Sequence, residues 1–118
     1  MGFFDRFRRP TVSAADAIRL VSEGATLLDV RENNEWNAGH APGAIHIPAG
    51  QVAAQAQRRL PKSKQVIVVC RSGARARGVT NTLRGLDIEA LNLSGGMRAW
   101  ERAGGRVVGK RNLPGIVT

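Results

Sequence analysis

The feature that most constrains the fold is the run Gln-Val-Ile-Val-Val at residues 65–69, which leads directly into Cys70. Its apolar residues follow one another without alternation, and all of them are Val or Ile. This pattern is typical of a central parallel strand that is covered on both faces. Helices are therefore expected on both sides of the sheet that contains this strand.

The rest of the chain supplies alternating strands and helices, bounded by glycine, proline and capping residues. A turn with one helical turn is expected at 31–39. Strands are expected at 26–30, 44–47 and 89–93, and helices at 14–23, 50–59, 74–85 and between the glycine pairs of 95–105. This alternation implies right-handed crossovers. We therefore predict an α/β fold with a mainly parallel central sheet flanked by helices on both faces.

With 118 residues, the chain has the length of one domain. The predicted domain covers 11–108, between an N-terminal Phe/Arg-rich extension at 1–10 and a C-terminal tail at 109–118, for which little structure is predicted. Residues 1–9 combine three Phe with three Arg. They are interpreted as a terminus that packs on the domain, with a weak contact to a membrane surface or partner as the alternative.

The composition excludes several kinds of site and partner. One cysteine and two histidines rule out a disulfide framework and a multi-cysteine metal cluster, so no metal and no cofactor are expected. The apolar stretches are no longer than a strand and the N-terminus lacks a secretion signal, so the expected location is the cytoplasm. The net charge of +9 indicates an anionic partner or substrate. Five aromatic residues without Tyr offer few stacking platforms, so nucleic acid is not the expected partner.

Cys70 stands where an active crevice is expected, because such crevices lie beyond the carboxyl ends of parallel strands. A short loop and a helix follow it; the loop residues are Arg71, Ser72, Gly73, Ala74 and Arg75. The loop N–H groups, the helix N-terminus and the arginines favour a thiolate over a thiol. The segment predicts a nucleophilic cysteine with its own anion site. A lone cysteine at a strand end is otherwise usually a small buried hydrophobe.

The charge distribution agrees with an anionic substrate at this segment. No Asp or Glu occurs between Trp36 and Leu86, whereas eight Lys and Arg residues do. One of them, Arg77, is equally consistent with a solvated helix residue. His40 and His46 flank proline-containing loops, and neither is clearly placed to act as a base. Because the chain has no second cysteine, any group loaded on Cys70 must pass to an outside acceptor.

Three motifs together resemble the single-domain rhodanese family of thiosulfate sulfurtransferases. Residues 27–48 carry Asp-Val-Arg-Glu, Glu-Trp, Gly-His, Pro-Gly-Ala and His-Ile-Pro, which are similar to the family's N-terminal signature. Residues 68–76 resemble its active-site loop, and 93–100 resemble its Gly-Gly-x-x-x-Trp element. The motifs occur in the family's order over about 11–108.

The resemblance implies a five-stranded sheet, with one short strand near Val12. It implies that Cys70 takes a sulfane sulfur from thiosulfate or a persulfide donor and passes it to cyanide or a thiol. A protein could fill either the donor or the acceptor role. The loop 70–75 carries over as the persulfide pocket, with backbone N–H groups around the sulfur and Arg75 closing the loop.

Asp29 and Arg31 match the family's Asp-Val-Arg, and the resemblance implies supporting roles for them. Asp29 is expected to hold adjacent loops through hydrogen bonds. Arg31 is expected to pair with a carboxylate such as Glu35, with direct substrate contact as the alternative. The remaining matches are to scaffold positions, namely Trp36, Pro42, Gly43, Gly95, Gly96 and Trp100.

The chain departs from the family pattern at three positions. Ala74 stands where the family often has Asn, Ala76 where it often has Ser, and Ala41 where Ile is usual. The loop changes remove polar side chains, so the pocket would depend more on backbone N–H groups and on Arg71 and Arg75. These changes leave the preferred donor open.

Three other functions remain open from the sequence. A persulfide carrier or partner-binding module would share the fold and would be distinguished by its lack of turnover. Cysteine phosphatases and arsenate reductases use a longer loop, whereas here four residues separate Cys70 from Arg75. The shorter loop suits one sulfur atom better than a tetrahedral phosphate. Nucleic-acid binding is suggested by charge alone, without a recognised motif.

Overall fold

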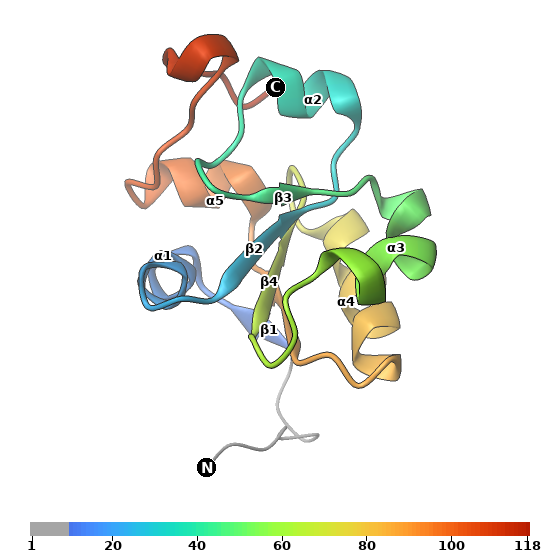
Figure 1. Ribbon diagram of the computed structural model, residues 1–118. Coiled ribbons are helices and arrows are strands. Elements are labelled where there is room, and N and C mark those ends of the chain that lie inside the picture. Colours follow the sequence, from blue (N-terminus) through green and yellow to red (C-terminus); the bar gives the residue numbers. More distant parts are fainter. Residues whose placement is uncertain (1–9) are drawn as a thin grey trace.

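The buried run seen in the sequence forms strand β4 (Val66–Val69) at the centre of a five-stranded sheet (Figure 1). In this computed structural model, which describes residues 10–118, the strand order is β1-β5-β4-β2-β3. Every neighbouring pair is parallel, so the predicted α/β class is confirmed. The other strands are β1 (Thr11–Val12), β2 (Thr26–Asp29), β3 (Ile45–His46) and β5 (Ala90–Leu93).

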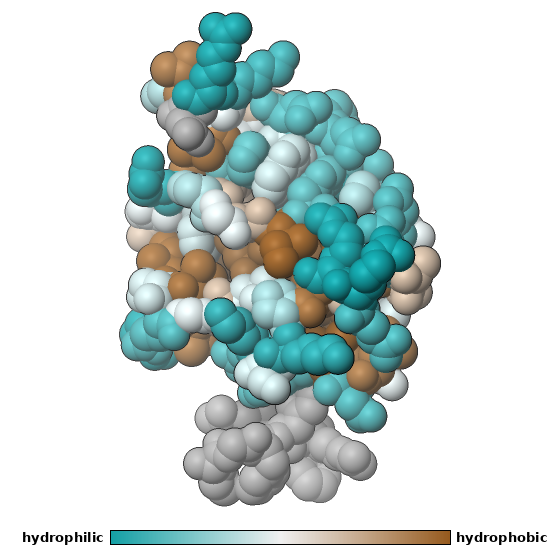
Figure 2. Space-filling view, in the orientation of Figure 1, coloured by the Kyte–Doolittle hydropathy of each residue, from teal (hydrophilic) through white to brown (hydrophobic). Residues whose placement is uncertain are grey.

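Helices cover both faces of this sheet, as the unalternating strand requires. The helices are α1 (Ala14–Ser22), α2 (Asn33–Ala38), α3 (Val52–Arg59), α4 (Ala74–Gly85) and α5 (Gly96–Arg102), with short 3₁₀ helices at Ala49–Gln51 and Lys110–Asn112. Val66 and Val68 pack with α3 and α4 in one core cluster, and Ile67 and Val69 pack with α1 and α5 in the other. Figure 2 shows hydrophilic residues over most of the face in view, with apolar residues in smaller groups between them.

The N-terminal elements follow their local sequence signals. The Ser13 hydroxyl accepts a hydrogen bond from the Asp16 N–H at 3.1 Å, which caps α1. The short strand expected near Val12 is β1, and it pairs with β5 at the sheet edge. The contact proposed for residues 1–9 falls outside the described residues. Within 10–118, none of the helices combines the length and apolarity that crossing a membrane needs.

The C-terminal segment has more structure than its composition predicts, because it folds back along α2 (Figure 1). Val108 and His40 exchange two backbone hydrogen bonds, at 2.8 and 2.9 Å. The Ile116 N–H donates to the Ala38 carbonyl at 3.0 Å. A Cβ atom added to Gly39 would lie 2.5 Å from the Ile116 backbone, so only glycine allows this close packing. The segment therefore holds the C-terminal end of α2 in place.

Candidate active site

Cys70 directly follows β4 at the carboxyl edge of the sheet, and its side chain is 1% exposed. The Gly73 N–H points at the Cys70 Sγ with a nitrogen–sulfur distance of 3.0 Å, and the Ala76 N–H does so at 3.4 Å. Gly73 has a φ of +111°, a conformation that favours glycine and lets the loop turn this tightly. Two backbone donors therefore converge on the only thiol of the chain.

The start of α5 holds the carbonyl groups of the same loop. The Met97 N–H donates to the Cys70 carbonyl at 2.7 Å, and the Arg98 N–H donates to the Arg71 carbonyl at 3.4 Å. Gly96 makes this approach feasible, because an added Cβ would lie 2.4 Å from the Arg71 carbonyl oxygen. Since these carbonyls are tied to α5, the following N–H groups of the loop remain available to the sulfur. The Gly-Gly pair thus has a packing role beside the thiol.

The loop itself divides into a buried floor and an exposed rim. Gly73 and Ala76 are buried, whereas the side chains between and before them face solvent; these exposed residues are Arg71, Ser72, Ala74 and Arg75. A separate cavity of about 620 Å³ lies near the amino ends of β4 and β5, lined in part by Leu60, Lys64 and Glu89. Because Cys70 is at the other end of β4, that cavity does not belong to the thiol's surroundings.

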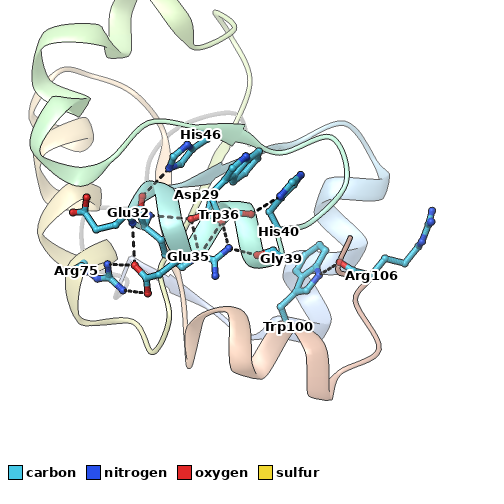
Figure 3. Close-up of polar contacts among 11 residues, drawn as sticks. Asp29, Glu32, Glu35, Trp36, Gly39, His40, His46, Arg75, Trp100 and Arg106 are labelled. Carbon is cyan, nitrogen blue, oxygen red and sulfur yellow. Dashed lines mark hydrogen bonds and ion pairs between the residues drawn. The ribbon is translucent and has the colours of Figure 1, made fainter. Parts of the chain in front are cut away.

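Arg75 is paired with Glu35, which corrects the expected pairing of Arg31 with Glu35 (Figure 3). The two terminal nitrogens of Arg75 each donate to one Glu35 oxygen, at 2.7 and 3.0 Å. The first of these oxygens also accepts the Glu32 N–H at 3.0 Å, as part of the capping box that starts α2. The Arg75 hydrogen bonds are the main reason that the pKa of Glu35 falls to about 2, although partial burial opposes the shift.

Arg31 instead pairs with Asp29 in the interior, and both side chains are at most 1% exposed. One carboxylate oxygen accepts from the Arg31 backbone N–H and Nε, each at 3.0 Å, and the other accepts from a terminal nitrogen at 2.7 Å. The same nitrogen donates to the Gly39 carbonyl at 2.7 Å. Complete burial leaves Arg31 no surface for a substrate. The Asp29 carboxylate is linked through Arg31 to the Gly39 carbonyl at the end of α2.

The two histidines flank the Trp36 ring and are held by backbone carbonyls (Figure 3). His40 stacks on Trp36 with ring centroids 3.7 Å apart, and His46 does so at 4.7 Å. His40 Nδ1 lies 2.8 Å from the Trp36 carbonyl and His46 Nε2 lies 2.8 Å from the Arg31 carbonyl, so each of these nitrogens donates a hydrogen bond. These contacts assign both rings to the packing of α2.

Two side chains, Glu35 and Asn92, contact the loop although the sequence did not place them there. Glu35 was assigned to the wrong arginine. It is the last acidic residue before the acid-free stretch that contains Cys70. Asn92 on β5 is 3% exposed, and its side-chain nitrogen lies 3.5 Å from the Gly73 carbonyl. A polar residue inside a predicted strand was the available signal for Asn92, because buried amides usually have a specific partner.

The Glu35–Arg75 pair predicts a measurable pH dependence of stability. A carboxyl whose pKa falls on folding stabilises the folded state above its ordinary value of 4.5, and this contribution is lost as the pH falls toward about 2. We expect Glu35→Gln to lower the free energy of unfolding by about 1 kcal/mol at neutral pH, since solvent weakens this partly exposed pair. Urea denaturation should show the difference from wild type shrinking below pH 4.5. A difference that stays constant down to about pH 2.5 would contradict the pairing.

Comparison with known proteins finds relatives over most of the chain. The family described as "Rhodanese-like domain" matches residues 13–103. "Putative sulfurtransferase YtwF" of Bacillus subtilis (strain 168) is 39% identical over 75 residues, which are 64% of this chain and 72% of that protein. "Putative sulfur carrier protein YrkF" of the same organism is 34% identical over 79 residues, or 66% of this chain but only 42% of that longer protein.

The fold also matches solved structures. The rhodanese-like domain of the Anabaena protein Alr3790, determined by solution NMR, superposes with a TM-score of 0.77 at 28% sequence identity. The superposition covers 92% of this chain and 88% of that one. The five-stranded sheet and its flanking helices are therefore an arrangement found in solved proteins of this kind.

Proposed function

The chain belongs to the rhodanese-like family, and from that premise we propose that it is a sulfurtransferase that works through a persulfide on Cys70. The donor is thiosulfate or a persulfide, and the acceptor is cyanide or a thiol. The observation that supports this proposal most directly is the convergence of the Gly73 and Ala76 N–H groups on the Cys70 sulfur. Its relatives named as sulfurtransferase and sulfur carrier support the same reaction class.

In the first half-reaction the Cys70 thiolate attacks the outer sulfur of thiosulfate. The sulfur–sulfur bond of the donor breaks, sulfite leaves with the electron pair, and the protein retains a persulfide anion. In the second half-reaction cyanide attacks the outer sulfur, thiocyanate leaves, and the thiolate is restored. Charge is conserved in both steps, and no proton has to move. The backbone donors at the sulfur stabilise the anion by about 1.5–3 kcal/mol per charge-assisted hydrogen bond.

The burial of Cys70 restricts what can react with it. Because the side chain is 1% exposed, the sulfur is open only to small reagents that can pass the loop. A sulfane sulfur is a single atom at the end of its donor, so only that atom has to pass the loop. Burial also keeps water away from the loaded sulfur, which strengthens the electrostatic contribution of the N–H groups.

Mass spectrometry of the intact protein after exposure to thiosulfate tests the proposal. We expect a gain of one sulfur atom that cyanide removes, and no gain in Cys70→Ser. Because the chain has one cysteine, the position of the added sulfur is not ambiguous. An unchanged mass after exposure to both thiosulfate and a low-molecular-weight persulfide would refute the persulfide mechanism.

Steady-state kinetics should follow a ping-pong pattern. Since sulfite leaves before the acceptor binds, double-reciprocal plots at several fixed cyanide concentrations should give parallel lines. Intersecting lines would require donor and acceptor to be bound together and would contradict the covalent intermediate.

A sulfur carrier is the second candidate, supported by the relative that bears that name. A carrier would load Cys70 with sulfur but release it only to a specific protein thiol. Loading without steady-state turnover of thiosulfate and cyanide would favour the carrier, whereas sustained turnover would favour the enzyme.

A further inference from the structure

The positive charge next to the thiol is partly cancelled by Glu35. Arg75 lies between Ala74 and Ala76 in the chain, and the Ala76 N–H contacts the sulfur. Both terminal nitrogens of Arg75 are bonded to the Glu35 carboxylate. The pKa of Arg75 is raised mainly by this hydrogen bond, and negative charge on Cys70 adds to the shift. The ion pair therefore lies within electrostatic reach of the reacting sulfur.

Glu35 is fixed by the protein, unlike a typical surface carboxylate. One of its oxygens also accepts the Glu32 N–H, so the start of α2 sets its direction. The far end of α2 is held by the buried Arg31, which donates to the Gly39 carbonyl, and by the C-terminal segment at Ala38. The Glu35 side chain is only 14% exposed. A preorganised carboxylate loses little entropy when it holds Arg75, so the pair persists in solution.

We propose that Glu35 is a specificity-determining residue that acts through Arg75, cancelling the guanidinium charge beside Cys70 and so lowering the preference of the site for anionic sulfur donors over uncharged ones. The proposal rests on the sulfur transfer proposed above and deepens it by naming a substrate property. The exposed Arg71 still attracts anions to the rim, but the charge of Arg75 is balanced by Glu35. Persulfide donors of low charge are therefore able to compete with the thiosulfate dianion.

Alkylation of Cys70 by iodoacetate and by iodoacetamide tests the charge balance directly. The two reagents are similar in size, but only iodoacetate is an anion. The rate constant for iodoacetate divided by that for iodoacetamide therefore reports the local potential and cancels changes in access. Removing Glu35 in Glu35→Gln should raise the ratio about fivefold, and Arg75→Gln should lower it by a similar factor. The double variant restores the charge balance and should return to the wild-type ratio.

The predicted order of the alkylation ratios in these three variants separates a charge effect from a structural one. If the pair only held the loop in shape, the double variant would depart furthest from wild type instead of returning to it. Glu32→Gln is the matched control, because it removes the same charge at the same end of α2 from a residue outside the salt bridge. It should change the ratio less than twofold. An unchanged ratio in Glu35→Gln, or a double variant outside the range of the two single variants, would overturn the proposal.

Kinetics with thiosulfate provide a second readout. We expect Glu35→Gln to lower the KM for thiosulfate about fivefold with kcat changed less, because the liberated charge attracts the dianion before reaction. The alkylation experiment does not need turnover. If the alkylation ratios follow the predicted order but Cys70 takes up no sulfur, the sulfurtransferase proposal alone is overturned. If Cys70 takes up sulfur but the alkylation ratio is the same in all variants, the role of Glu35 is overturned. A thiol inert to both reagents and to thiosulfate would overturn both.

Discussion

Cys70→Ser should abolish sulfur transfer while leaving the domain folded. The serine hydroxyl is a poor nucleophile toward sulfur at neutral pH and cannot hold a persulfide, so kcat/KM with thiosulfate and cyanide should fall by at least about 10⁴-fold. The Gly73 and Ala76 N–H groups can donate to a hydroxyl oxygen, so the buried position stays satisfied. The melting temperature should therefore remain close to that of wild type. Turnover and thermal unfolding measured on one preparation would check both expectations.

Residual turnover in folded Cys70→Ser would be decisive against the mechanism. The chain has no other cysteine to accept the sulfur, so activity above the uncatalysed rate would require a different nucleophile. Loss of activity together with unfolding would leave the catalytic role unproven in that variant. Cys70→Ala then serves as a second test, because it removes the thiol without adding a polar group to the core.

Much of the fold could be predicted because its signals are local. Consecutive residues predict both the strand β4 and the turn from Cys70 to Gly73 before α4. The structure contains both. The C-terminal segment was missed for the opposite reason. Its backbone pairs with His40, nearly seventy residues earlier in the chain, and no periodic pattern in the segment marks that partner. Pairing of this kind depends on tertiary contacts that short-range patterns do not record.

The site shows the same division between local and distant contacts. Cys70 and its loop follow from their place at a strand end, but the pairing of the charged residues does not. Arg31 and Glu35 are four residues apart, a spacing that indicates contact only within a helix. Because α2 begins at Asn33, Arg31 precedes the helix and turns inward to Asp29 instead. Glu35 is then free to pair with Arg75, forty residues further along the chain.

Gly96→Ala should be the most damaging substitution that leaves every polar group of the site unchanged. The added Cβ would lie 2.4–2.5 Å from the carbonyl atoms of Cys70 and Arg71, which are backbone and cannot rotate away. Gly96 also has a φ of +63°, which adds about 1 kcal/mol of strain for alanine. The loop must therefore move away from α5 and carry its N–H groups with it. A displacement of about 1 Å at a catalytic group costs on the order of 10²-fold in rate.

Gly104→Ala is the matched control for this prediction. Gly104 follows the other end of α5 and has a φ of +95°, but no atom lies within 4 Å of its added Cβ. It also places alanine at a positive φ but without the clash, so it should lose some stability and keep its activity. A steeper loss of kcat/KM in Gly96→Ala than in Gly104→Ala, at similar melting temperatures, would show that the carbonyls of the loop must be seated on α5. Equal activity in the two variants would mean that the N–H groups around the sulfur tolerate displacement, and the backbone cradle would then not be the source of catalysis.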